Sequence, residues 1–205
     1  VDINIEQWPQ AREWLLKTWS SPLEDNWQSD QHRRQRKHEA ETLTRKDARR
    51  KALAPHIDAI VAGTAPAHVL HQLAGAYEER FYDIAGDTPE LRVQDFLVAD
   101  EGTARAAIAN LARVLERDDL PSADEVLGLD AKGKYHLLRP PALLAARLAY
   151  EREPGVVDTW PEPLLATLVA FWLTDGMGEM PGWYKKAVES RPMIVAPLLV
   201  RHALP

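Results

Sequence analysis

The sequence contains no cysteine among its 205 residues. That absence excludes disulfide bridges, thiolate catalysis and every zinc site that uses sulfur ligands. Long apolar runs are missing as well, because the longest, such as residues 194–200, are far shorter than the roughly 18 residues needed to cross a bilayer. The N-terminus shows no basic start followed by an apolar stretch. We therefore expect a soluble, cytoplasmic protein that does not contact a membrane.

The sequence also lacks the common motifs of enzyme active sites. No Gly-Lys-Ser or Gly-Lys-Thr occurs, and the Gly176-Met177-Gly178 segment has no predicted strand before it, so a phosphate-binding loop is not indicated. None of the serines lies in a Gly-x-Ser-x-Gly turn. We predict that this chain is not an enzyme, has no catalytic residue and uses no cofactor.

Two histidines come closest to a metal site. His68 and His71 are three residues apart on a predicted helix, but a site needs further ligands, and only Glu78 or Asp83 lies nearby. We predict that no metal is bound. Acidic pairs such as Asp118-Asp119 and Asp124-Glu125 precede or begin predicted helices, where the helix dipole gives carboxylates a structural role.

Charge is distributed unevenly along the chain. The 25 basic and 31 acidic side chains give a net charge of −6, which argues against nucleic-acid binding by the whole surface. The segment 32–51 reverses this sign, with 9 basic and 3 acidic residues. It has almost no apolar residue, yet it has good helix formers and neither proline nor glycine. We predict a solvated helix that continues towards Leu53.

This basic helix is the one feature with a plausible macromolecular ligand. Its candidate contact residues are Arg33, Arg34, Arg36, Lys37, Arg45, Lys46, Arg49 and Arg50. Three interpretations stay open: a helix that is solvated or paired within the protein, a site for a protein partner or neighbouring domain, and a site for nucleic-acid phosphates.

Tryptophan is concentrated at the start of the chain. Four of the seven tryptophans are Trp8, Trp14, Trp19 and Trp27. Apolar residues from Ile5 to Trp19 recur in steps of three or four, which predicts an amphipathic helix ending near Ser20. These aromatic side chains are expected to pack in a core or to form an interface with a partner. We assign residues 1–54 to an N-terminal region made of this helix and the basic helix.

Residues 55–205 are predicted to form one helix after another. Helix starts are indicated at Pro66, Thr88, Thr103, Ser122 and Pro140. Helix breaks are expected in ranges rich in glycine, proline or aspartate, at 63–64, 86–87, 118–121, 128–133, 153–161 and 175–182. Residues 93–98 fit a strand or a helical face, and no hairpin pattern supports the strand.

Several short phrases in this region resemble a known family. They are Leu73-Ala74-Gly75-Ala76-Tyr77, Gly86-Asp87-Thr88-Pro89, Arg117-Asp118-Asp119-Leu120-Pro121-Ser122, Leu138-Arg139-Pro140-Pro141-Ala142-Leu143-Leu144, Trp183 and Arg191-Pro192. Over residues 66–204 the chain resembles the HEAT-like helical repeats that follow the ATPase core in large bacterial NACHT-type signalling NTPases. The resemblance implies an interaction or sensor region of a multidomain protein, of a kind that serves phage defence, with the ATPase elsewhere.

Together these observations predict an all-α fold, an irregular solenoid of stacked helical pairs over residues 55–205. Because the chain begins at Val1 and ends after an apolar, helix-forming run, we expect a fragment of a longer protein. The predicted function is a non-enzymatic protein-interaction, sensor or scaffold module. The alternative is a helical module that binds nucleic acid through residues 33–51.

Overall fold

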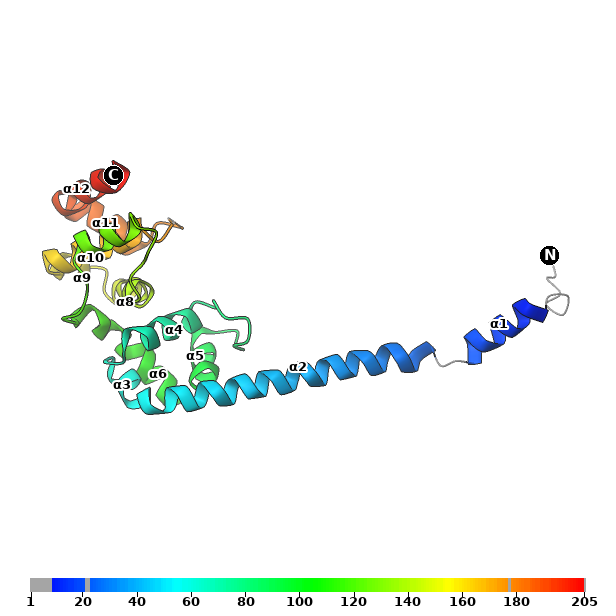
Figure 1. Cartoon of the computed structure of the whole chain (residues 1–205). Helices are drawn as coiled ribbons and strands as arrows, with labels where there is room; N and C mark the ends of the chain where they lie inside the picture. Colours follow the sequence, from blue (N-terminus) through cyan, green and yellow to red (C-terminus); the bar gives the residue numbers. More distant parts are fainter. Residues whose placement is uncertain (1–8, 21–22, 177, 205) are drawn as a thin grey trace. The chain divides into compact units, whose positions relative to one another are not determined.

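The computed structural model describes residues 9–20, 23–176 and 178–204 (Figure 1). All regular elements in these ranges are helices and none is a strand, which confirms the predicted all-α class. Residues 93–97, which fitted either type, belong to a helix. Within the same ranges, no helix is both long enough and apolar enough to span a bilayer.

The chain divides into two units, one up to Ala48 and the other from Arg49 onward. Our sequence analysis placed a boundary after residue 54. Two helices begin the chain: α1 (Pro9–Ser20) and α2 (Leu23–Leu53). The later helices are η2 (Ala54–His56), α3 (Ile57–Ala62), α4 (Ala67–Tyr77), α5 (Pro89–Leu97), α6 (Glu101–Asn110), η3 (Leu111–Glu116), α7 (Ala123–Asp130), α8 (Arg139–Arg152), α9 (Val156–Thr159), α10 (Glu162–Leu173), α11 (Gly182–Ser190) and α12 (Pro192–Ala203).

Helix α2 is stabilised locally and not by an apolar stripe. From Asp30 to Ala48 no residue is buried. Local contacts include the Gln35 amide donating to Glu39 at 3.0 Å and the Thr44 hydroxyl donating to the Ala40 carbonyl at 2.8 Å. The helix ends at Leu53, as predicted, and Pro55 lies in the following 3₁₀ turn, where its missing N–H costs no hydrogen bond.

Side-chain caps set several later helix starts. Thr88 accepts from the Leu91 N–H, and Ser122 forms a reciprocal capping box with Glu125, so both predicted starts are confirmed. The prediction for Thr103 was wrong by one turn, because Asp100 caps α6 and accepts from the Thr103 N–H. The predicted break at 128–133 begins too early, since α7 continues through Gly128 to Asp130.

The helices of the second unit bury their apolar faces around α8. Helix α8 packs on η3, α4, α10 and α11, while α10 also packs on α7 and α12. Figure 1 shows α3 to α6 on one side of α8 and α10 to α12 on the other. The largest fully buried side chains include Trp183, Phe171, Ile60 and Leu138. The core is therefore continuous from α3 to α12.

One glycine permits a close approach in this packing. Gly63 ends α3 with φ of 72°, in the left-handed region that glycine adopts without steric cost. A Cβ atom there would lie 2.5 Å from the Asn110 carbonyl oxygen. The absence of a side chain lets the end of α3 contact the end of α6, where the Asn110 amide donates to the Val61 carbonyl at 2.6 Å.

Arginine side chains satisfy backbone carbonyls at helix ends and adjoining turns throughout the second unit. The last carbonyls of a helix have no partner within it, and a cation there also favours the helix dipole. Arg92 donates to the Tyr77 carbonyl at 2.8 Å, and Arg139 donates to the Thr174 carbonyl at 2.6 Å. Arg117 donates to the Ala65 carbonyl at 2.9 Å, and Arg191 to the Trp160 carbonyl at 3.0 Å. These bonds connect segments 15 to 52 residues apart.

We predict that Arg139→Met lowers the free energy of unfolding by about 1.5–3 kcal/mol, the range for a hydrogen bond made by a charged group. The change leaves the Thr174 carbonyl without its donor and removes the ion pair with Asp175, whose Oδ1 lies 3.1 Å from Nε. Urea denaturation measures the effect. Arg152→Met is the matched control, since Arg152 is exposed at the end of the same helix and its removal should stay within about 0.5 kcal/mol of the parent.

Candidate functional site

Four basic side chains lie together on α2: Arg33, Arg34, Arg36 and Lys37, here called the basic quartet. Spacings of three and four residues place Arg33, Arg36 and Lys37 on one side of the helix. All four side chains are exposed. The quartet therefore presents four positive charges within five residues of a helix that uses none of them for core packing.

Local carboxylates neutralise little of this charge. Among the described residues, one ion pair of the quartet is present, between Arg33 and Asp30 at 3.9 Å, and both side chains are more than half exposed. A pair with this separation and exposure contributes little to stability, because solvent screens it. The quartet is thus available to a negatively charged partner.

The other predicted basic residues lie in different surroundings. Arg45 pairs with Glu41 at 3.8 Å, Lys46 is half-buried, and Arg50 is exposed. Arg49 belongs to the second unit, where its guanidinium pairs with Asp83 and lies 5.5 Å from the centre of the Phe96 ring. Only 15% of each of the Arg49 and Asp83 side chains is exposed, so Arg49 contributes to the fold.

The predicted aromatic residues are only partly described. Trp14 lies on α1 with 65% of the residue exposed. Trp19 and Trp27 lie in α1 and α2, but their side chains are outside the described part of the structure, as is the whole of Trp8.

The two candidate metal-ligating histidines contact different neighbours. The rings of His68 and His56 meet edge to face with centres 6.0 Å apart. His71 stacks on Tyr135 at 5.9 Å, and its Nδ1 lies 3.3 Å from the Leu137 carbonyl. Within the described ranges, no group of three or more acidic or histidine side chains has the arrangement of a metal site.

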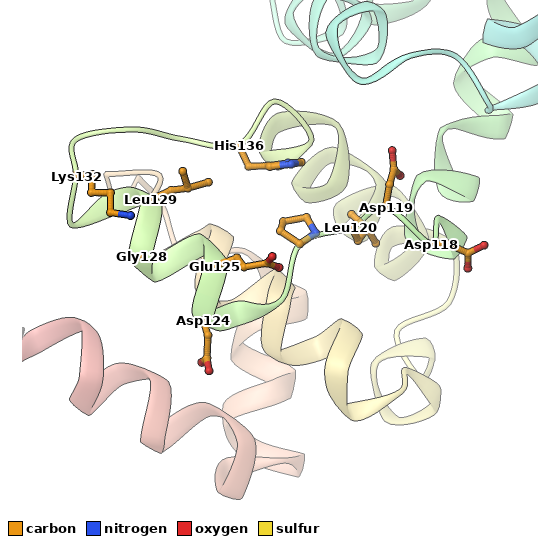
Figure 2. Close-up of a pocket in the computed structure, with 10 residues that line it drawn as sticks. Asp118, Asp119, Leu120, Asp124, Glu125, Gly128, Leu129, Lys132 and His136 are labelled. Atoms are coloured by element: carbon orange, nitrogen blue, oxygen red, sulfur yellow. The ribbon is translucent and has the colours of Figure 1, made fainter.

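A groove of about 790 Å³ lies in the second unit beside α7 (Figure 2). One side is formed by residues 118–121, and the other by α7 and the turn that follows it, with His136 above. That turn is tight because Gly133 has φ of 64°. The carboxylates along the groove are Asp118, Asp119, Asp124 and Glu125.

Three of these carboxylates have structural partners. Asp119 accepts two hydrogen bonds from Arg117, at 2.6 and 2.7 Å, and this contact lowers the pKa of Asp119 and raises that of Arg117. Glu125 accepts from the Ser122 N–H and hydroxyl, which lowers the pKa of Glu125. Asp124 pairs with Arg201 at 2.5 Å, and Figure 2 shows it extending away from His136. The groove is therefore shaped by helix caps and ion pairs.

Our sequence analysis assigned both acidic pairs to helix starts. For Glu125 this is confirmed, whereas Asp119 pairs with Arg117. Neither His136 nor the groove was predicted from the sequence. The available signal was the position of His136, three residues before the start of a helix whose first turn contains Pro140 and Pro141 and so offers few N–H groups.

No protein-family model, curated protein or solved structure matches this chain.

We predict that Asp119→Asn lowers the free energy of unfolding at pH 7 by about 0.2–1 kcal/mol, a small effect because this carboxylate is exposed to solvent. Since the pKa of Asp119 is lowered in the folded state, its contribution is present above about pH 4 and disappears as acid protonates the carboxylate. Parent and variant should therefore converge in urea denaturation as the pH falls through 4 towards 3.

Asp118→Asn is the control for the Arg117–Asp119 pair. It removes the adjacent exposed carboxylate, which does not bind Arg117. A constant difference between Asp119→Asn and the parent across this pH range would contradict the assignment.

Proposed function

We propose that this chain is a non-enzymatic protein-interaction module, serving as a sensor or scaffold, and that its basic quartet binds an acidic surface of a partner protein. The observation that supports the proposal is the exposure of all four side chains on a helical stretch with no buried residue. The helix needs none of these charges for its own packing, so a partner can use them without disturbing the fold.

The chemistry of the quartet fits carboxylates. Three of its members are arginines, whose planar guanidinium groups bind a carboxylate through two parallel hydrogen bonds. Four clustered charges also accelerate encounter with a surface of opposite sign and disfavour basic partners. The acidic partner is either another protein or a neighbouring domain of the parent chain.

We propose that the helices of the second unit form the scaffold, as an irregular solenoid. The support is that many helices contact those nearby in the chain: α5 packs on α4 and α6, and α12 packs on α10 and α11. The resemblance of residues 66–204 to the HEAT-like region of NACHT-type NTPases supports the same proposal. In that case the ATPase is elsewhere in a larger bacterial, cytoplasmic protein.

The same exposed charge supports a second candidate function, binding of nucleic acid. Arginine and lysine on a solvated helix neutralise backbone phosphates as readily as carboxylates, and affinity then falls steeply with salt. Nuclease treatment distinguishes the two functions. A protein bound to the quartet stays bound after the nucleic acid has been digested, whereas material bound as nucleic acid is lost.

We predict that the immobilised chain captures a discrete protein from nuclease-treated bacterial lysate, and that R33E/R34E/R36E/K37E reduces the captured amount at least tenfold. Reversing four charges converts attraction for carboxylates into repulsion. Quantitative mass spectrometry of the eluates measures the loss, and circular dichroism verifies that the variant keeps its helices.

The control reverses the same number of exposed basic residues in the second unit, in K132E/K134E/R152E/K185E, and should retain capture. Capture that disappears on nuclease treatment would establish the nucleic-acid alternative. Equal capture by the quartet variant and the parent would overturn both functions of the quartet.

A further inference from the structure

His136 holds the start of α8. Its Nδ1 atom accepts a hydrogen bond from the Leu138 N–H at 3.2 Å, and its carbonyl accepts from the Arg139 N–H at 3.0 Å. Leu138 is 0% exposed, so water does not offer its amide an alternative acceptor. Because Pro140 and Pro141 have no N–H, the Leu138 and Arg139 amides are the donors that this helix start must satisfy.

This bond fixes the protonation state of the ring. An imidazole nitrogen that accepts a hydrogen bond carries no proton, so His136 is neutral with its proton on Nε2. The ring stacks on Phe171 of α10, with centres 6.3 Å apart and planes 28° apart. It is half-buried, and this burial lowers the pKa of His136, while Asp119 and Glu125 act in the opposite direction.

The charged groups around the ring come from α7, from the segments on either side of it, and from α8. Asp118 and Asp119 precede α7, Asp124 and Glu125 belong to its first turn, and Lys132 follows it. Arg139, the first residue of α8, donates to the Thr174 carbonyl and lies over the Tyr135 ring. The residue of α10 that contacts His136 is Phe171, which carries no charge.

We propose that His136 is a pH-sensitive latch: as the neutral imidazole it holds the first turn of α8, and when protonated it releases the Leu138 amide and turns towards Asp119 and Glu125. Protonation at Nδ1 replaces the acceptor by a donor, so the buried Leu138 N–H faces another N–H and loses its partner. The imidazolium is attracted to the carboxylates of Asp119 and Glu125, which line the two sides of the groove, so the shape of the groove depends on pH.

The sign of the effect follows from linkage. Because the pKa of His136 is lower in the folded state than the ordinary value of about 6.5, the unfolded chain takes up this proton first. The stabilisation by the neutral ring is complete above about pH 6.5 and is lost as the pH falls through the folded-state pKa.

Nuclear magnetic resonance on the full chain tests the latch. The His136 ring carbons should titrate with a midpoint below about 6.5, and the Leu138 amide shift should follow the same midpoint. The hydrogen-exchange protection factor of Leu138 should fall by roughly tenfold across this transition, because the amide loses its acceptor.

Two substitutions separate the latch from general acid sensitivity. His136→Asn keeps an oxygen acceptor that does not titrate, so Leu138 should stay protected and its shift should no longer show the transition seen in the parent. His136→Phe keeps an aromatic face towards Phe171 but has no acceptor, so the protection factor of Leu138 should be roughly tenfold below that of the parent with a neutral ring, at every pH. In Asp119→Asn the His136 midpoint should fall further, because a carboxylate that favours the imidazolium has been removed.

His68→Gln is the control for histidine titration, since His68 is exposed and contacts His56. It should leave the Leu138 profile unchanged. A Leu138 amide shift that does not follow the titration of the His136 ring, or one that titrates in His136→Asn as it does in the parent, would overturn the proposal.

Discussion

The fold of the second unit depends on arginine side chains that satisfy backbone carbonyls belonging to other segments. Its helices are short, so a large share of their carbonyls lie in last turns or in the adjoining loops and have no partner within a helix. Arg92, Arg117, Arg139 and Arg191 each supply a charged donor to such a carbonyl. Each of these hydrogen bonds satisfies a carbonyl of one segment and holds a second segment against it. Together they fix how α4, α8, α9 and α10 are arranged.

The first unit follows a different principle. The part of α2 before Arg49 gains its helicity from local propensity and from contacts one turn apart, and no residue between Asp30 and Ala48 is fully buried. Charge on such a helix is not constrained by packing. This independence supports an interaction role for the basic quartet. In the second unit, by contrast, the carboxylates of the groove are used as caps and ion-pair partners, and His136 is a hydrogen-bond acceptor.

Much of the fold could be predicted from the sequence, because helix starts and stops are local. Ser122 and Glu125 form a capping box whose spacing is visible in the sequence, and Pro55 marks the end of α2. The error at Thr103 has a simple reason: Asp100 is an equally good cap one turn earlier, and sequence alone does not rank two caps on the same helix. The predicted helix break at 128–133 includes the left-handed turn at Gly133, but it starts too early, because residues 128–130 still belong to α7.

The sequence by itself determined the helical class, the exposed basic stretch and the absence of cysteine chemistry, because each depends on composition and on spacings within a few residues. Tertiary structure decided which arginine serves which carbonyl, because those partners are up to 52 residues apart. It also distinguished Arg49, paired with Asp83, from the exposed quartet of the same helix. The surroundings of His136 required both levels: its bond to Leu138 is local, but the ring that stacks on it belongs to α10.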